Sequence, residues 1–178
     1  PSAVMTNHKL IGLLAAKGRD VLVSTGMQTD EELQELGAEF SPLNNLVVMH
    51  CVSNYPTLAV NSQIGFLHQL QRRYGFRIGY SSHDALWETA LWSLPFGIEY
   101  LERHITLSKS QIGLDHSSSS TPEEFHRLVS LTKDFCKALE GAEGPRKVNQ
   151  GEKINLQNLG QGLYAKESLE TGAYIEVN

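Results

Sequence analysis

The chain has little cysteine, and its two cysteines follow no pattern. Cys51 lies in an apolar, strand-like run and Cys136 in a helix-like segment. A disulfide framework needs several cysteines at regular spacings, so none is expected here. Disulfides persist mainly in oxidising compartments, and two isolated cysteines therefore predict two reduced thiols in a cytoplasmic protein.

Long apolar runs and dense basic blocks are also missing. No run approaches the ~20 apolar residues that span a bilayer, so no membrane partner is expected. The opening residues, PSAVMTNHKL, lack the apolar centre of a signal peptide. The formal net charge is -5, from 15 Lys and Arg against 20 Asp and Glu, which argues against nucleic acid as a partner.

The sequence does contain a regular alternation of two kinds of segment. Short apolar runs, which predict strands, occupy residues 20–25, 45–53, 77–83 and 98–106. Apolar residues at helical spacing predict helices over 6–17, 30–37, 62–75, 85–96 and 122–139. Gly18 and Gly37 are expected just after helices, Asp30 as an N-cap and Pro122 in a first turn. Repeated βα units of this kind predict an α/β fold with a parallel sheet.

The pattern changes after the last of these helices. Residues 141–159 are polar and rich in glycine, which predicts a linker between a first domain, 1–140, and a C-terminal segment, 160–178. Residues 160–178 resemble the opening of a small β-rich module and are too few to build a core of their own.

Two histidines stand where predicted strands end. His83 closes the third apolar run and His104 lies in the fourth, and Asp115 follows on the next loop. A strand–helix–strand unit brings the C-terminal ends of two parallel strands side by side. The two imidazoles are therefore expected at one mouth, as a metal or catalytic site on the loop face of an α/β barrel.

Hydroxyl groups gather at the same predicted strand ends. They include Ser24 with Thr25, Ser53 with Tyr55, and Ser81, and Glu102 precedes the second histidine. Serine hydroxyls suit a phosphate or carboxylate ligand, because they donate hydrogen bonds to anionic oxygens. Two neutral imidazoles suit a divalent metal, with water or substrate oxygens completing its shell.

Six ordered motifs, taken together, resemble the sialic acid synthase family. They are STGM (24–27), HCVSNYP (50–56), IGYSSH (78–83), LERHITL (101–107), GLDHSSS (113–119) and PEEF (122–125). The resemblance implies a (β/α)8 TIM barrel, present here in part, followed by a linker and the start of an antifreeze-like module. It also implies metal-dependent condensation of phosphoenolpyruvate with an N-acylated amino sugar, such as N-acetylmannosamine, with release of phosphate.

The resemblance assigns roles residue by residue. The metal, expected to be Mn or Mg, falls on His83 and His104, and catalytic roles fall on Glu102 and Asp115. Phosphoenolpyruvate binding falls on Ser2, Ser24 and Ser81, and further substrate binding on Ser53 and Tyr55; Tyr55 and Asp115 lie on the sugar side. Relatives of this kind are expected to be homodimers when full length.

The chain departs from the family pattern in two ways. Family members usually read S-D-H where this chain has Ser81-Ser82-His83, so a carboxylate beside the metal is expected to be lost. The lysines that hold the phosphate would lie upstream of residue 1. The chain is thus expected to be a C-terminal piece, with about five of eight βα units, open sheet edges, an exposed apolar interior and a tendency to self-associate.

Simpler alternatives exist for each assignment. A histidine at a strand end is often a hydrogen-bonded structural residue, and Ser24 or Asp115 could serve only as a cap. Tyr55 could only shape the turn before Pro56, and Glu102 could only pair with Arg103. For the whole chain, the alternative to an enzyme is an inactive fragment or a non-catalytic relic that binds carbohydrate or phosphate.

Overall fold

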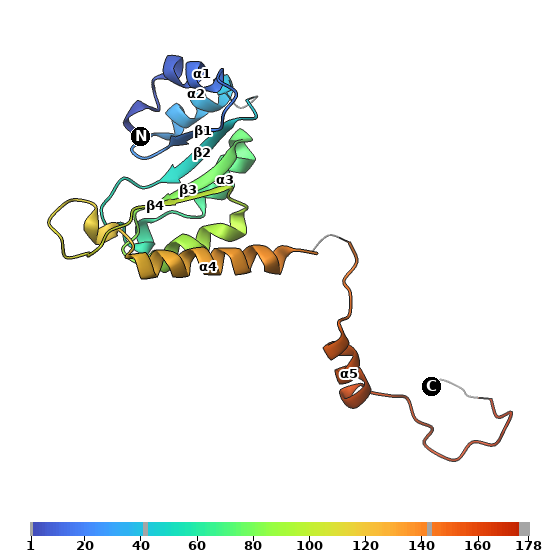
Figure 1. Ribbon diagram of the computed structural model, residues 1–178. Coiled ribbons are helices and arrows are strands. Elements are labelled where there is room, and N and C mark those ends of the chain that lie inside the picture. Colours follow the sequence, from blue (N-terminus) through green and yellow to red (C-terminus); the bar gives the residue numbers. More distant parts are fainter. Residues whose placement is uncertain (1, 41–42, 142–143, 175–178) are drawn as a thin grey trace. The chain divides into compact units, whose positions relative to one another are not determined.

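The computed structural model describes residues 2–40, 43–141 and 144–174, which form two compact units, 1–139 and 140–178. The first unit contains a four-stranded parallel sheet in the order β1-β2-β3-β4 (Figure 1). Its strands are β1 (Val21–Ser24), β2 (Leu46–Cys51), β3 (Arg77–Ser82) and β4 (Tyr100–Arg103). All four predicted strands are therefore confirmed, each within the predicted range.

Helices follow the strands in the predicted alternation. The α-helices of the first unit are α1 (His8–Ala15), α2 (Asp30–Phe40), α3 (Phe66–Tyr74) and α4 (Pro122–Leu139). Short 3₁₀ helices are η1 (Ser2–Val4), η2 (Ala59–Asn61), η3 (Trp87–Phe96) and η4 (His116–Ser118). None of the helices in the described residues is both long and apolar enough to cross a membrane.

Three of the predicted helix details need correction. Segment 87–96 forms a 3₁₀ helix, with Pro95 inside it, in place of an α-helix. Gly37 does not end α2, which runs on to Phe40; an added Cβ at Gly37 would lie 3.2 Å from the Tyr74 ring, so a small residue is needed there. Asp30 is the first helical residue rather than the cap.

The N-terminus of α2 is instead closed by Thr29 and Glu32. The Thr29 N–H donates to the Glu32 carboxylate at 2.8 Å, and the Glu32 N–H donates to the Thr29 hydroxyl at 3.3 Å. This reciprocal pair is a capping box, which satisfies two helix-end donors at once.

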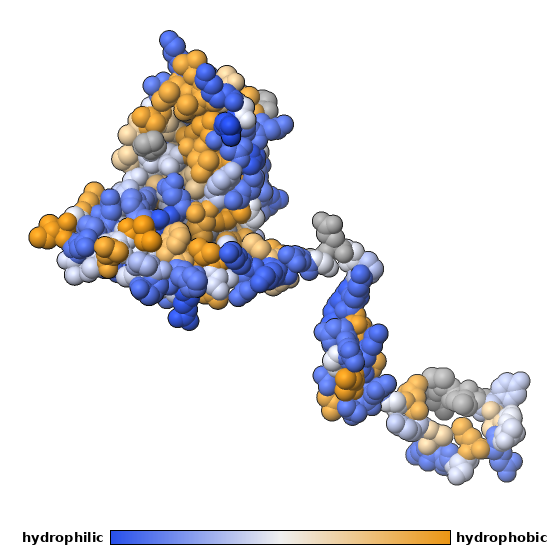
Figure 2. Space-filling view, viewed as in Figure 1, coloured by the Kyte–Doolittle hydropathy of each residue, from blue (hydrophilic) through white to orange (hydrophobic). Residues whose placement is uncertain are grey.

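The core of the first unit lies between the helices and one face of the sheet. Strand residues pointing to this face alternate with those pointing away, as the two-residue period of a strand requires. The core residues, all under 10% exposed, include Val23, Leu46, Val48, Ile78 and Tyr80 from the strands and Ile11, Leu33, Leu36, Phe40, Leu67 and Leu70 from the helices. Apolar side chains also reach the outer surface of this unit, where Figure 2 shows them with polar side chains around them.

The opposite face of the sheet carries the alternate residues. On β2 these are Val47 and Met49, which are at most 1% exposed, so the predicted exposed apolar interior is not seen at this central strand. On the edge strand β1, Leu22 is 38% exposed. Among the described residues β1 and β4 are the sheet edges, and self-association through them stays a prediction.

The second unit differs from its prediction. Residues 150–159, expected within a linker, form α5 (Gln150–Leu159), which opens with a capping box between Asn149 and Glu152. The predicted β-rich module has no strand in residues 160–174, and residues 175–178 lie outside the described part.

An ion cluster joins the N-terminal ends of three strands. Arg77 donates to Asp20 at 2.9 and 3.0 Å and to Glu99 at 2.9 Å, and the Tyr100 hydroxyl donates to Asp20 at 2.6 Å. The bonds from Arg77 and then Tyr100 hold the pKa of Asp20 at about 2, below its usual 3.8. This cluster lies at the end of the sheet opposite to the histidines.

The stability of the protein is expected to depend on this cluster in acid. A depressed folded-state pKa stabilises the protein above the unfolded pKa, and that contribution disappears as the pH falls from about 4 to about 2. In the unmodified protein the midpoint of urea unfolding is therefore expected to fall as the pH is lowered from about 4 to about 2. In Asp20→Asn this fall is expected to be smaller, because only the contribution of Glu99 remains. Asp134→Asn, at an exposed position of α4, is the control. An identical slope for Asp20→Asn and the unmodified protein would contradict the prediction.

Candidate functional site

A cavity opens at the C-terminal ends of the strands. Its volume is about 790 Å³. It is lined by Ser2, Ala3, Leu22, Ser24, Met27, Cys51, Ser53, Tyr55, Ser81, His83, Glu102, His104 and Leu114. Eight of the nine predicted site residues are in this lining. The ninth, Asp115, lies beside it, with Oδ2 at 3.9 Å from Nδ1 of His104.

The register of β3 and β4 explains why the two histidines meet. Ser81 is paired with Glu102 and Ser82 with Arg103, so His83 and His104 are the next residues in line as both strands end. Their ring centroids are 5.2 Å apart. The predicted convergence of the two imidazoles is therefore present, while their role as metal ligands stays a prediction.

Tyr55 packs against both histidine rings. Its ring centroid is 4.3 Å from that of His83 and 6.1 Å from that of His104, the second contact being edge-to-face. Burial, followed by the nearby Cys51, Asp115 and Glu102, raises the pKa of Tyr55. The neutral phenol thus forms a wall of the cavity, which goes beyond shaping the turn before Pro56.

His83 is held by the chain that follows β2. Its Nδ1 lies 3.2 Å from the carbonyl oxygen of Val52, which can only accept, so Nδ1–H donates and Nε2 keeps its lone pair. Burial lowers the pKa of His83, and the charge of His104 acts in the same direction. A neutral imidazole with a free Nε2 is the form in which histidine binds metals.

Two carboxylates, those of Glu102 and Asp115, lie beside the histidines. Glu102 is exposed and its Oε1 accepts the Ser81 hydroxyl at 2.8 Å, so Glu102 is turned away from Arg103. The Asp115 side chain makes no capping bond to η4, so the alternative of a pure cap is not supported. Both carboxylates remain available at the edge of the cavity.

The serine hydroxyls surround a thiol. Cys51 Sγ lies 3.9 Å from Oγ of Ser2 and 3.8 Å from Oγ of Ser53, and 3.6 Å from Nδ1 of His83. From the sequence, Cys51 was expected only to be a reduced thiol, and its place in the site was missed. Its position at the end of β2, in the same strand-end set as Ser24 and Ser81, was the signal that could have found it.

The two histidines supply only part of the coordination shell that a divalent metal needs. Among residues 2–40, 43–141 and 144–174, no three His, Cys, Asp or Glu side chains form a group that could hold a metal ion. His83 and His104 alone offer two imidazoles, and the orientation of His83 leaves Nε2 free. The residues present therefore fit a metal that takes its other ligands from water or substrate oxygens.

Ser82 does not lie in the cavity. Its hydroxyl is buried behind β3, where it donates to Oδ2 of Asp84 at 2.6 Å and accepts from Nη1 of Arg103 at 2.8 Å. The expected loss of a carboxylate from the wall beside the metal is therefore wrong as stated, because this position faces away from the histidines. Neither Asp84 nor the role of Arg103 was recognised in the sequence.

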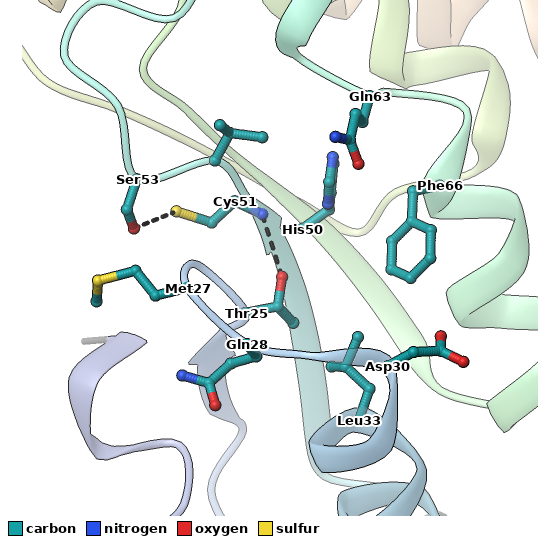
Figure 3. Close-up of a pocket in the computed structure, with 11 residues that line it drawn as sticks. Thr25, Met27, Gln28, Asp30, Leu33, His50, Cys51, Ser53, Gln63 and Phe66 are labelled. Carbon is teal, nitrogen blue, oxygen red and sulfur yellow. Dashed lines mark hydrogen bonds between the residues drawn. The ribbon is translucent and has the colours of Figure 1, made fainter.

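A second cavity, of about 440 Å³, shares a wall with the first (Figure 3). Met27, Cys51 and Ser53 line both. In the wall the Cys51 N–H donates to the Thr25 hydroxyl at 3.3 Å, which in turn donates to the Met49 carbonyl at 3.2 Å. The His50 ring lies on the far side, where Nε2 is 2.9 Å from the Ser62 carbonyl, so His50 is a hydrogen-bonded structural residue.

The sequence matches a known family over most of its length. The model of the NeuB family matches residues 1–144, and the chain therefore belongs to the NeuB family. It is 26% identical to the N,N'-diacetyllegionaminic acid synthase of Campylobacter jejuni, over 97% of this chain and 52% of that protein. It is 29% identical to the human N-acetylneuraminate-9-phosphate synthase, over 97% of this chain and 48% of that protein.

A solved structure agrees with the fold. The crystal structure of N-acetylneuraminic acid (sialic acid) synthetase from Leptospira borgpetersenii, in complex with citrate, superposes with a TM-score of 0.73 at 28% identity. The match covers 89% of this chain and 56% of that one. The parallel sheet of residues 1–139 is thus a curled half-barrel of this fold, and the chain spans about half the length of the relatives it matches.

Proposed function

We propose that the protein containing this chain condenses phosphoenolpyruvate with an N-acylated amino sugar, releasing phosphate and forming a sialic acid-type product. The observation that carries the proposal is the convergence of two histidines, four serine hydroxyls, Tyr55 and Glu102 on one cavity at the strand ends. The names of the relatives, synthases of legionaminic acid and of N-acetylneuraminate 9-phosphate, support the same class of reaction.

The two histidines would hold the divalent metal, expected to be Mn or Mg. Once bound, the ion would supply Lewis-acid polarisation of the sugar aldehyde. His83 contributes a neutral ring fixed by the Val52 carbonyl, and Tyr55 packs against this ring and excludes water from one side of it. Asp115, beside His104, would accept a hydrogen bond from a sugar hydroxyl.

The remaining residues would act on the phosphoenolpyruvate half. The hydroxyls of Ser2, Ser24 and Ser53, which line the cavity, would donate to phosphate or carboxylate oxygens. C3 of phosphoenolpyruvate would bond to the aldehyde carbon as the C=O π bond opens, and the former aldehyde oxygen would take up a proton. Water would add at C2 and lose one proton to Glu102, which the Ser81 hydroxyl orients. The new C2 hydroxyl would lose its own proton to the departing phosphate as the C2–O bond to phosphate breaks, which leaves a keto group at C2.

The direct test is product formation by the full-length protein. Phosphate release is followed with phosphoenolpyruvate and N-acetylmannosamine, with Mn²⁺ or Mg²⁺ present and after chelation, and the product is identified by mass spectrometry. Metal-dependent release that requires the sugar supports the proposal. Release at the same rate without any amino sugar would contradict it.

One observation favours a second candidate, a non-catalytic relic that binds phosphate or carbohydrate. Within the described residues, the cavity lining contains neither lysine nor arginine, so a multiply charged phosphate would rest on hydroxyls alone. Saturable binding of phosphoenolpyruvate without turnover in the full-length protein would favour this candidate over the enzyme.

Gly26 provides a test of the serine sites. A Cβ at Gly26 would overlap Oγ of Ser53 and lie 2.7 Å from Oγ of Ser2, so Gly26→Ala must displace both hydroxyls. A hydrogen bond to a charged group contributes about 1.5–3 kcal/mol, and loss of one is expected to weaken phosphoenolpyruvate binding roughly 10- to 100-fold. Isothermal titration measures the change. Gly65→Ala, where the added Cβ meets nothing within 4 Å, is the control; equal affinities in the two variants would count against the assignment.

A further inference from the structure

Three buried polar residues flank the two histidines without reaching the cavity. Ser82 and Asp84 are the neighbours of His83 on either side, and Arg103 immediately precedes His104. Their exposures are 0%, 1% and 8%, and none of the three is in the cavity lining. A buried guanidinium and a buried carboxylate are costly unless they are paired and hydrogen-bonded, so their presence here needs an explanation.

Arg103 holds the chain on both sides of His83. Its Nη1 donates to the Ser82 hydroxyl at 2.8 Å, and its Nη2 donates to the Asp84 carbonyl at 2.9 Å. Its Nε donates to the Ser120 hydroxyl at 2.6 Å, and the Ser120 N–H donates to the His104 carbonyl at 2.9 Å. One side chain thus links the backbone around His83 to the backbone around His104.

The charge of Arg103 reaches a carboxylate through a hydroxyl. Ser82, which accepts from Arg103, donates to Oδ2 of Asp84 at 2.6 Å, and the Tyr80 hydroxyl donates to the same oxygen at 2.7 Å. No direct ion pair between Arg103 and the Asp84 carboxylate exists within 4.0 Å in the described part of the chain. Ser82 is therefore the link between the two charges.

We propose that Asp84, acting through Ser82, is the counter-charge of Arg103, and that Arg103, Ser82 and Asp84 form a positioning unit that fixes the spacing of His83 and His104. The unit touches neither substrate nor metal; it acts through the backbone on either side of the rings. The proposal rests on the proposed function only where metal affinity is the measurement.

The position of the carboxylate provides a discriminating test. Asp84→Asn keeps the shape of the side chain and removes its negative charge. The double variant S82D/D84N restores a carboxylate at position 82, the side chain to which Arg103 donates directly. In the full-length protein, Asp84→Asn is expected to weaken Mn²⁺ binding roughly 10- to 100-fold, the range for groups that orient metal ligands. The double variant is expected to recover most of that loss. Mn²⁺ affinity is measured by competition with a fluorescent chelator.

A second measurement does not depend on metal. In metal-free protein labelled with ¹⁵N in the histidine rings, the His83 and His104 signals are assigned by H83Q and H104Q. These signals are expected to shift in Asp84→Asn and to return in S82D/D84N. Asp20→Asn is the matched control, because it removes the carboxylate partner of Arg77 at the other end of the strands. This variant is expected to lower the melting temperature. It is expected to leave both histidine signals and the Mn²⁺ affinity unchanged.

The outcomes separate the two proposals. If Asp84→Asn lowers only the melting temperature, as Asp20→Asn does, the unit is merely structural and the inference is wrong. If S82D/D84N recovers neither the Mn²⁺ affinity nor the histidine signals, the proposed electrostatic link between Arg103 and Asp84 through Ser82 is wrong.

If Asp84→Asn does not fold, Ser82→Ala provides the test, because it keeps both charges and removes the hydroxyl that links them. The histidine signals are then expected to shift in the same direction by a smaller amount, and the absence of any shift overturns the proposal. If the unmodified protein binds no Mn²⁺, the proposed function loses its metal, while the ring signals still test the positioning unit.

Discussion

Replacing either His83 or His104 by glutamine is expected to lower kcat/KM of the full-length protein by roughly 10²- to 10⁴-fold. Lewis-acid activation contributes several kcal/mol to lowering a barrier, and each 1.36 kcal/mol corresponds to a factor of ten in rate. Glutamine keeps a similar volume and a polar end, so the Tyr55 ring retains its packing while the imidazole lone pair is lost. The same variants are expected to lose most of the Mn²⁺ affinity measured by titration.

The control for this prediction is His68→Gln. His68 lies on α3, outside the cavity, where its ring is 3.1 Å from Arg72, so activity and metal affinity are expected to stay unchanged. Full activity in His83→Gln or in His104→Gln would refute the assignment of the two histidines. Loss of activity with unaltered Mn²⁺ affinity would instead place them in proton transfer or substrate contact.

The strands and their ends were predictable because the signal for a buried parallel strand is local. Runs such as NLVVMHCVS are apolar on both faces, and β2 is indeed buried along its whole length. The C-terminal ends of two parallel strands joined by a helix meet at one edge of the sheet, and this rule was sufficient to bring His83, His104 and Glu102 together.

Features set by contacts across the fold were not predictable in the same way. Gly37 was expected to end α2, but its lack of a side chain instead makes room for the ring of Tyr74, a residue of a different helix and far away in sequence. The 3₁₀ form of 87–96 was also not predicted, although Pro95 near the end of this segment is visible in the sequence. The helix at 150–159 was missed although Asn149 and Glu152 have the spacing of a capping box.

The largest error in the site concerned the direction of one side chain. Ser82 was treated as a neighbour of the metal because it adjoins His83 in sequence, but successive strand residues point to opposite faces. Ser82 therefore faces Arg103 and Asp84, on the side of the sheet away from the cavity. Arg103 lies on β4 and Asp84 on the segment after β3, and the register of β3 with β4 brings Arg103 beside Ser82.

Leu70→Ala is expected to destabilise the first unit more than any single polar change at its surface. Leu70 is 0% exposed and belongs to the core cluster, on a helix that packs against β2, β3 and α2. Truncating a buried leucine removes transfer free energy and leaves a cavity, which together cost about 2–5 kcal/mol. Domains of this kind are stable by only about 5–15 kcal/mol, so the variant is expected to lose a large share of its stability.

Urea unfolding followed by circular dichroism measures this loss, with Leu13→Ala as the control. Leu13 lies on α1 and is 59% exposed, so its truncation is expected to change the free energy of unfolding by at most about 0.5 kcal/mol. Because α3 supports β3, which carries Ser81 and ends next to His83, Leu70→Ala is also expected to loosen the cavity before global unfolding. Equal unfolding midpoints for Leu70→Ala and Leu13→Ala would show that the helices are not packed on the sheet as described.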